Sequence, residues 1–157
     1  MIKYIRTNFQ NEDFIALVKR LDAELAERDR EEHAFYSQYN KIDLLQHVIV
    51  AYHADVPSGC GAIKKLGPEV MEVKRMYTLP EKRGLGIASG ILKRLENWSI
   101  ELNCFQCRLE TGKKQPEAIA LYTKSGYIFI PSYGQYAGIS NSICFEKTLT
   151  RSTNFHS

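Results

Sequence analysis

Residues 82–90 have the composition of a phosphate-binding loop. They read Lys-Arg-Gly-Leu-Gly-Ile-Ala-Ser-Gly, so two cations are followed by three glycines within nine residues. Glycine has no side chain to block a ligand from the backbone N–H groups. Where such a loop opens a helix, the unpaired N–H groups carry roughly half a positive charge and bind phosphate well. The segment therefore predicts a site for a small polyanion, with Lys82 and Arg83 in front of it.

The residues on either side of this loop are predicted to form a strand and a helix. Val70 to Thr78 favours a half-buried strand, and Pro80 ends it because proline lacks a ladder donor. From Ile87 the hydrophobic period becomes helical, and one apolar stripe contains Ile87, Ile91, Leu95, Trp98 and Leu102. The helix N-terminus should therefore lie in the loop.

This order of strand, loop and helix resembles the acetyl-CoA-binding motif of the GNAT superfamily of N-acetyltransferases. Its signature is Gln or Arg, two residues, Gly, one residue, then Gly or Ala, and it is met by Arg83, Gly86 and Ala88. Residues 115–127 resemble the family's C-terminal motif, commonly Asn-x-x-Ala-x-x-Leu-Tyr-x-x-x-Gly-Phe, with Gln115 where the family often has Asn. The resemblance covers residues 2–150 and is strongest over 70–130.

The resemblance implies an α/β fold with a mixed, mostly antiparallel sheet of six to seven strands and about four flanking helices. At 157 residues the chain suits one domain with a single core, which we expect at 1–150, followed by a tail at 151–157. Residues 57–59, Pro-Ser-Gly, are predicted to form a turn. The pattern predicts strands at 2–7, 47–53, 60–66, 70–78, 107–111, 127–130 and 143–149, and helices that begin after Asn11, at Ile87 and at Pro116.

The resemblance also assigns roles in acetyl transfer from acetyl-CoA to an amine. Tyr122 occupies the position of the family's general-acid tyrosine, and its alternative role is that of a core aromatic. Glu72 has the placement of the carboxylate base in part of the family, and Glu110, at the end of the next strand, is the second candidate. The alternative for either carboxylate is a strand-surface position or an ion pair, in which case a water chain would take the proton.

Further residues are expected to hold the cofactor. A backbone N–H near Met76 is implied as the donor to the thioester oxygen, and Thr78 as the main-chain partner of the pantetheine arm. Arg83 is the direct cation, and Lys82 or Lys124 is the candidate for the remaining phosphate. The pyrophosphate is expected on the main chain of Arg83, Gly84, Gly86, Ile87, Ala88 and Ser89.

Composition argues against several other classes. A net charge of +3 without a basic run gives no support for nucleic-acid binding. No apolar run approaches the ~20 residues of a membrane span, and the N-terminus lacks a secretory pattern, so a cytoplasmic location is expected. The four cysteines are expected to be reduced and structural, and with the histidines they show no metal-ligand spacing, so no metal is predicted.

Other interpretations stay open. The glycine segment also mimics a dinucleotide fingerprint, although five residues separate the strand from the first glycine where that turn should be immediate. A non-catalytic acyl-CoA sensor or partner-binding domain is the serious alternative. For an enzyme, aromatic residues at 33–39 and at Tyr133 and Tyr136 suggest a pocket for a small-molecule amine or amino-acid-like acceptor. A peptide N-terminus and a homodimer are compatible with the sequence.

Overall fold

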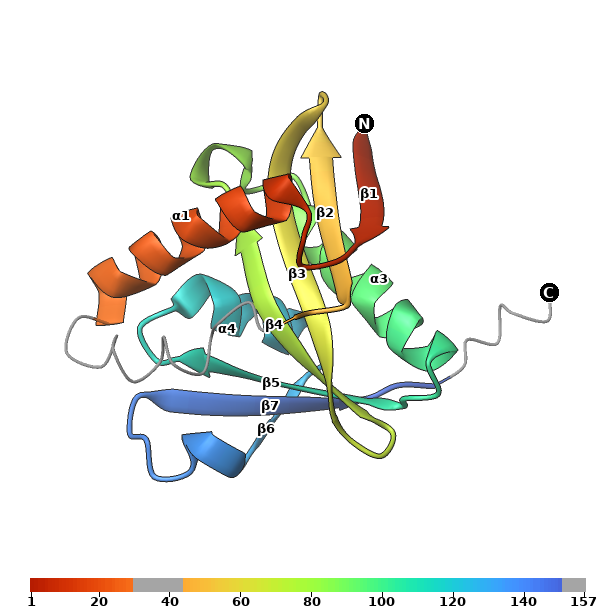
Figure 1. Cartoon of the computed structure of the whole chain (residues 1–157). Coiled ribbons are helices and arrows are strands. Elements are labelled where there is room, and N and C mark those ends of the chain that lie inside the picture. The colour runs from red at the N-terminus through yellow and green to blue at the C-terminus, as the bar shows by residue number, and fades with distance from the viewer. Residues whose placement is uncertain (30–43, 151–157) are drawn as a thin grey trace.

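The computed structural model describes residues 1–29 and 44–150 of the chain. Seven strands form one sheet in the order β1-β2-β3-β4-β5-β7-β6, and helices lie on both of its faces (Figure 1). Within the described ranges, no helix combines the length and the apolar character that crossing a bilayer requires. The elements are β1 (Ile2–Thr7), α1 (Glu12–Asp29), β2 (His47–His53), β3 (Val56–Gly67), β4 (Val70–Thr78), α3 (Ile87–Glu101), β5 (Gln106–Gly112), α4 (Pro116–Lys124), β6 (Ile128–Ile130) and β7 (Ser142–Thr148), with short 3₁₀ helices at Pro80–Lys82 and Gly134–Tyr136.

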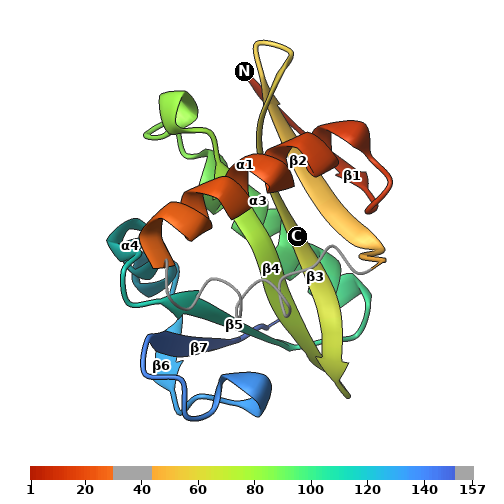
Figure 2. The same ribbon diagram turned by 60° about the vertical axis from the view of Figure 1, so that its left-hand side comes forward.

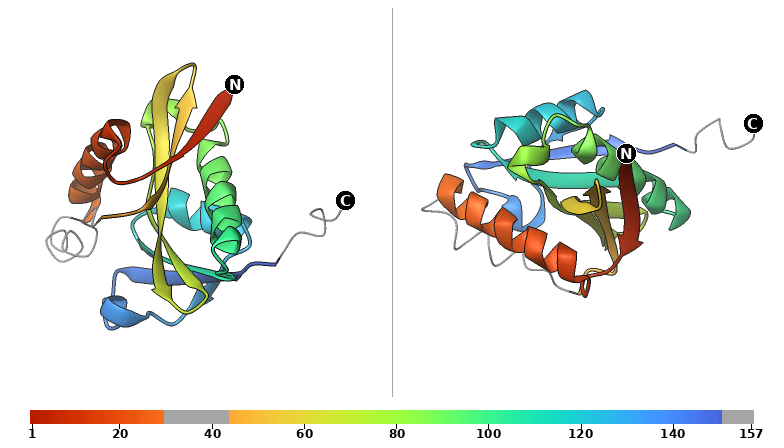
Figure 3. Two further views of the ribbon diagram at one scale, coloured as in Figure 1. Left: turned by 45° about the vertical axis from the view of Figure 1, so that its right-hand side comes forward. Right: turned by 90° about the horizontal axis from the view of Figure 1, so that it is seen from above.

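The sheet separates two hydrophobic clusters. Helix α1 packs on one face, whereas α3 lies on the other, as the edge-on view of the sheet makes plain (Figure 3). Strand β2 contributes to both clusters, since Val48 and Val50 pack with α1 while Ile49 and Ala51 pack with α3. A strand covered on both faces has no polar alternation, which explains its continuous apolar run. All four cysteines are buried and free, which agrees with the predicted packing role.

Local signals placed the helix ends correctly. The Asn11 side-chain oxygen accepts a hydrogen bond from the Phe14 N–H at 2.9 Å and so caps α1. Pro116 occupies the first turn of α4, where its missing N–H costs nothing. Gly126 follows that helix with φ 94°, a conformation that favours glycine. The predicted tail and the aromatic segment 33–39 lie outside the described residues.

The predicted turn at residues 57–59 is wrong, because these residues belong to β3. The chain reverses instead at Ala54 and Asp55, whose φ angles are 52° and 64°. Glycine stands at position 59 for a different reason. A Cβ there would lie 2.9 Å from both the Tyr77 carbonyl oxygen and Ile87 Cγ2. Gly59 therefore allows α3 to pack closely on the sheet.

One pair of neighbouring strands separates along its length. β4 and β5 are parallel and are paired only at Val70–Gln106, Met71–Cys107 and Glu72–Arg108. Beyond Glu72 the two strands diverge (Figures 1 and 2). Backbone groups of β4 beyond this point have no partner on β5, and such groups are available to a ligand that adds like a strand. The remaining neighbours in the sheet are antiparallel.

Candidate active site

The glycine loop forms an uncapped helix N-terminus. Gly84 and Gly86 have φ angles of 87° and 81°, and Gly86 is the N-cap residue of α3. A Cβ on either glycine would meet nothing within 4 Å, so the backbone conformation, rather than crowding, is what requires glycine. Within the described part of the chain, no side chain caps this end of α3. Its first-turn N–H groups are therefore suited to an anion.

Gly90 has a different role from the other two glycines. It lies inside α3, where a Cβ would collide with the Tyr4 ring. The same ring carries the Arg94 guanidinium 3.7 Å from its centroid. Gly90 therefore serves the contact between β1 and α3.

A cavity of about 340 Å³ extends from this loop into the gap beside β4. Its volume is within the range of small-molecule sites. Residues of α1, β4, the loop, α3 and α4 line it. Apart from the alternative phosphate candidate Lys124, the residues predicted to hold the cofactor are among them, together with the predicted acid: Met76, Thr78, Arg83, Gly84, Gly86, Ile87, Ala88, Ser89 and Tyr122.

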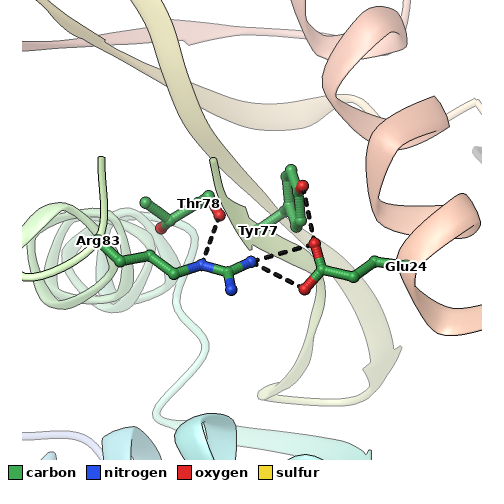
Figure 4. A network of polar contacts seen from close by, with 4 residues as sticks. All are labelled: Glu24, Tyr77, Thr78 and Arg83. Atoms are coloured by element: carbon green, nitrogen blue, oxygen red, sulfur yellow. Dashed lines mark hydrogen bonds and ion pairs between the residues drawn. The ribbon is translucent and has the colours of Figure 1, made fainter. Parts of the chain in front are cut away.

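Arg83 joins this loop to α1 (Figure 4). Its Nε donates to the Thr78 carbonyl oxygen at 3.0 Å, and its Nη2 donates to both Glu24 carboxylate oxygens at 2.9 and 3.2 Å. The Tyr77 hydroxyl donates to the same carboxylate at 3.0 Å. An anion that binds Arg83 therefore shares the guanidinium with Glu24, whose negative charge opposes that anion. No sequence signal marks Glu24, because it stands 59 positions from Arg83 in a charged helix.

The other two cations considered for phosphate occupy different places. Lys82 lines the large cavity, and its Nζ lies 3.0 Å from His53 Nδ1. Lys124, in the last turn of α4, lines neither this cavity nor the one described next. Lys82 is therefore the better candidate.

A second cavity, of about 90 Å³, adjoins the first. The two share six lining residues, namely Leu21, Leu25, Met76, Gln115, Ala118 and Tyr122. The remaining lining residues come from β4, from the end of β5 and from Tyr136. The divergence of β4 and β5 thus produces two compartments that meet at Met76 and Tyr122.

Tyr122 is the buried residue at this junction. Only 6% of it is exposed, and its ring packs against Tyr127 and Phe145 at centroid distances of 5.8 and 5.9 Å. Burial raises the pKa of its phenol, and the charge of Glu110 raises that pKa further. The phenol therefore holds its proton at neutral pH, as a proton donor must.

The two predicted carboxylates differ in position. Glu110 lines the smaller cavity and accepts a hydrogen bond from Ser142 Oγ at 3.0 Å. Glu72 is 5% exposed, lines neither cavity, and accepts a hydrogen bond from the Tyr133 hydroxyl at 2.7 Å. Its Oε1 lies 3.6 Å from Lys74 Nζ. The structure thus brings Glu110, rather than Glu72, beside Tyr122.

The loop before β7 also contributes to the smaller cavity. Tyr136 lines it, and Tyr133 packs edge-on against Tyr136 at a centroid distance of 5.4 Å. Burial raises the pKa of both phenols, and the nearby Glu72 raises each further. Of the two tyrosines expected to line an acceptor pocket, Tyr136 lines the smaller cavity. Tyr133 lines neither cavity and donates a hydrogen bond to Glu72 instead.

The sheet opens between β4 and β5, and the glycine loop at the N-terminus of α3 lines the large cavity beside this opening. The family model described as Acetyltransferase (GNAT) family matches residues 11–127. The chain therefore belongs to the GNAT family, and it is an acyltransferase.

Individual relatives agree with this assignment. The chain is 36% identical over 103 residues to an IAA acetyltransferase of Azospirillum brasilense, covering 64% of this chain and 67% of that protein. A Klebsiella pneumoniae structure assigned as an acyl-CoA N-acyltransferase is 28% identical with a TM-score of 0.80, over 96% of this chain and 99% of that one. PaiA N-acetyltransferase from Thermoplasma acidophilum, solved in complex with coenzyme A, shares the fold at 17% identity with a TM-score of 0.70, over 94% and 99% of the two chains.

Proposed function

We propose that this chain is an N-acetyltransferase that moves an acetyl group from acetyl-CoA directly onto the primary amine of a small, amino-acid-like acceptor. The observation that carries the proposal is the pair of adjoining cavities, with Tyr122 in the lining of both and Glu110 in the smaller one. One cavity has a donor set for a diphosphate, and the other has a carboxylate for an amine. Two substrates can therefore meet at Tyr122 without a covalent enzyme intermediate.

The larger cavity fits the cofactor by its chemistry. When bound, acetyl-CoA supplies an acetyl group activated as a thioester. The loop N–H groups around Gly86 and the first turn of α3 would hold its diphosphate, with Arg83 and Lys82 as cations. The main chain of β4 from Met76 to Thr78 would hold its pantetheine arm, because β5 is no longer paired with β4 there.

Glu110 is the proposed general base. An acceptor amine with a pKa near 10.4 is almost entirely protonated at pH 7, and removing that proton costs about 4.6 kcal/mol. Glu110 lines the smaller cavity directly, whereas Glu72 lies behind Tyr133 and beside Lys74. The carboxylate of Glu110 can therefore take a proton from an ammonium group in that cavity.

Tyr122 is the proposed general acid. The departing sulfur needs a proton, and the phenol of Tyr122 stays protonated because burial and Glu110 raise its pKa. In the transfer, the amine nitrogen forms a bond to the carbonyl carbon, the carbon–sulfur bond breaks, and Tyr122 gives its proton to sulfur. The nitrogen of an ammonium acceptor loses two protons. The first goes to Glu110 and the second restores the phenol of Tyr122, so each turnover yields one free proton.

An acyl-CoA sensor is the alternative proposal, and one experiment separates the two. Purified protein is titrated with coenzyme A by calorimetry and then assayed for thiol release from acetyl-CoA across a panel of amines. The enzyme should release thiol only with an amine and should yield the acetylated amine by mass spectrometry. Binding without release on any amine would favour the sensor, and absence of binding would overturn both.

Two variants test the choice of base. Glu110→Gln should lower kcat/KM at neutral pH by about 10²–10⁴-fold. Glu72→Gln serves as the matched comparison, since it removes the same charge from a buried position outside both cavities. A larger loss in Glu72→Gln would reverse the assignment. The cytoplasmic location and the homodimer stay predictions from the sequence.

A further inference from the structure

The smaller cavity carries opposite charges on its two sides. Lys74 and Arg75 on β4 line it, and Glu110 on β5 is the acidic residue among the described residues of its lining. The side chains of the two cations are only 7% and 4% exposed. Buried charges of this kind are costly unless an anion stands near them. The cavity is therefore polarised, with a cationic pole on β4 and an anionic pole on β5.

Each of these cations has a carboxylate partner outside the cavity lining. Lys74 Nζ is 3.6 Å from Glu72, and Arg75 Nη1 donates to Asp22 Oδ1 at 2.7 Å. Asp22 belongs to α1 and is 44% exposed. A guanidinium has five N–H donors in a planar fork, so the Nη1 contact with Asp22 does not by itself prevent Arg75 from binding a second oxyanion. These partners hold the cations in place at the wall of the cavity.

A local irregularity of β4 brings Arg75 to this wall. Arg75 has φ 60°, in the left-handed region that L-residues seldom adopt, and the register between β3 and β4 shifts across Cys60 and Ala62. Two consecutive cations of a regular strand would point to opposite faces. The bulge lets Lys74 and Arg75 line the same cavity.

We infer that the acceptor is a small zwitterion, whose amine lies toward Glu110 and whose carboxylate or other oxyanion lies toward Lys74 and Arg75. This inference rests on the acetyltransferase function proposed above and adds the chemistry of the acceptor. A zwitterion matches both poles of the cavity, whereas an amine without an anionic group would match only the Glu110 side. The cavity thus selects for the oxyanion as well as for the amine.

The test compares acceptors in matched pairs with the full-length protein. Each amino acid is assayed against its carboxamide and its decarboxylated amine, and aminoalkyl phosphonates are assayed against the corresponding alkylamines. The oxyanion-bearing member should have a kcat/KM at least about ten-fold higher, as expected for hydrogen bonds to charged groups. The two sets of pairs distinguish a carboxylate from a phosphonate.

Two variants locate the selectivity. Arg75→Gln and Lys74→Met should each raise the acceptor KM about ten-fold or more, leave the acetyl-CoA KM within about two-fold, and reduce the preference for the oxyanion. Arg6→Gln removes a guanidinium from an exposed ion pair with Glu101, outside both cavities, and should change neither constant. Equal turnover of charged and uncharged members by the unmodified protein would overturn this inference alone. Thiol release with no amine at all would overturn the proposed function and this inference with it.

Discussion

Replacement of Tyr122 by phenylalanine, compared with the same change at Tyr127, gives the sharpest test of the proton-donor role. The two rings are in edge-to-face contact at a centroid distance of 5.8 Å, and both are buried. Tyr122 lines both cavities, whereas the Tyr127 hydroxyl donates to the buried Glu96 at 2.9 Å. Each variant removes one oxygen atom from nearly the same place in the core.

Tyr122→Phe should lower the catalytic rate, whereas Tyr127→Phe should lower the stability of the fold. General acid catalysis contributes about 10²–10⁴-fold, and a donor whose pKa lies far above the working pH falls at the low end. Because the pKa of Tyr122 is raised, Tyr122→Phe should lower kcat about 10²-fold, which corresponds to about 2.7 kcal/mol. Tyr127→Phe removes one donor from Glu96, which keeps Lys147 at 3.0 Å, and should lower the free energy of unfolding by about 1–3 kcal/mol.

Steady-state thiol release and thermal denaturation measure these two effects on the same samples. Tyr122→Phe should keep its acetyl-CoA KM within about three-fold and its Tm close to that of the unmodified protein. Tyr127→Phe should keep its kcat and lose about 2–4 °C of Tm for each kcal/mol. If Tyr122→Phe turned over normally, or if both variants were slowed alike, the proton-donor role of Tyr122 would be refuted.

Three further predictions concern the cofactor loop, the packing of α3 and the buried phenols. Glu24→Gln releases Arg83 from a half-exposed ion pair worth about 0.2–1 kcal/mol and should lower the Kd for coenzyme A about 1.5- to 5-fold in calorimetry; an unchanged or weaker affinity would contradict the opposing effect of Glu24. Gly59→Ala places a Cβ 2.9 Å from the Tyr77 carbonyl oxygen and should cost about 1–3 kcal/mol in urea denaturation, whereas the control Gly67→Ala meets nothing within 4 Å and should stay within about 0.5 kcal/mol. The raised pKa values of Tyr122, Tyr127, Tyr133 and Tyr136 leave stability unaffected below about pH 10. Above that pH the unfolded chain releases phenol protons that the folded chain keeps, so the free energy of unfolding should fall by about 1.4 kcal/mol per pH unit for each tyrosine. A flat alkaline profile would refute this.

Local sequence was sufficient wherever a few neighbouring residues set the backbone. The strand Val70–Thr78 has the predicted bounds, and α3 begins at the predicted Ile87. Asn11 and Gly126 mark helix ends because their conformational preferences act within one turn. The turn predicted at 57–59 was wrong for the opposite reason. Glycine is required at position 59 by its contacts with Ile87 and Tyr77, which are distant in the sequence.

The sequence alone therefore determined the family-like motif, the position of the helix N-terminus at Ile87 and, through the resemblance, the candidate acid Tyr122. Only the tertiary structure decided how the charged groups are arranged. It paired Glu24 with Arg83. It placed Glu110, Lys74 and Arg75 in the lining of the smaller cavity and left Glu72 buried outside that lining. The physical reason is range: backbone preferences act over a few residues, whereas a buried charge depends on side chains that folding brings together from distant parts of the chain.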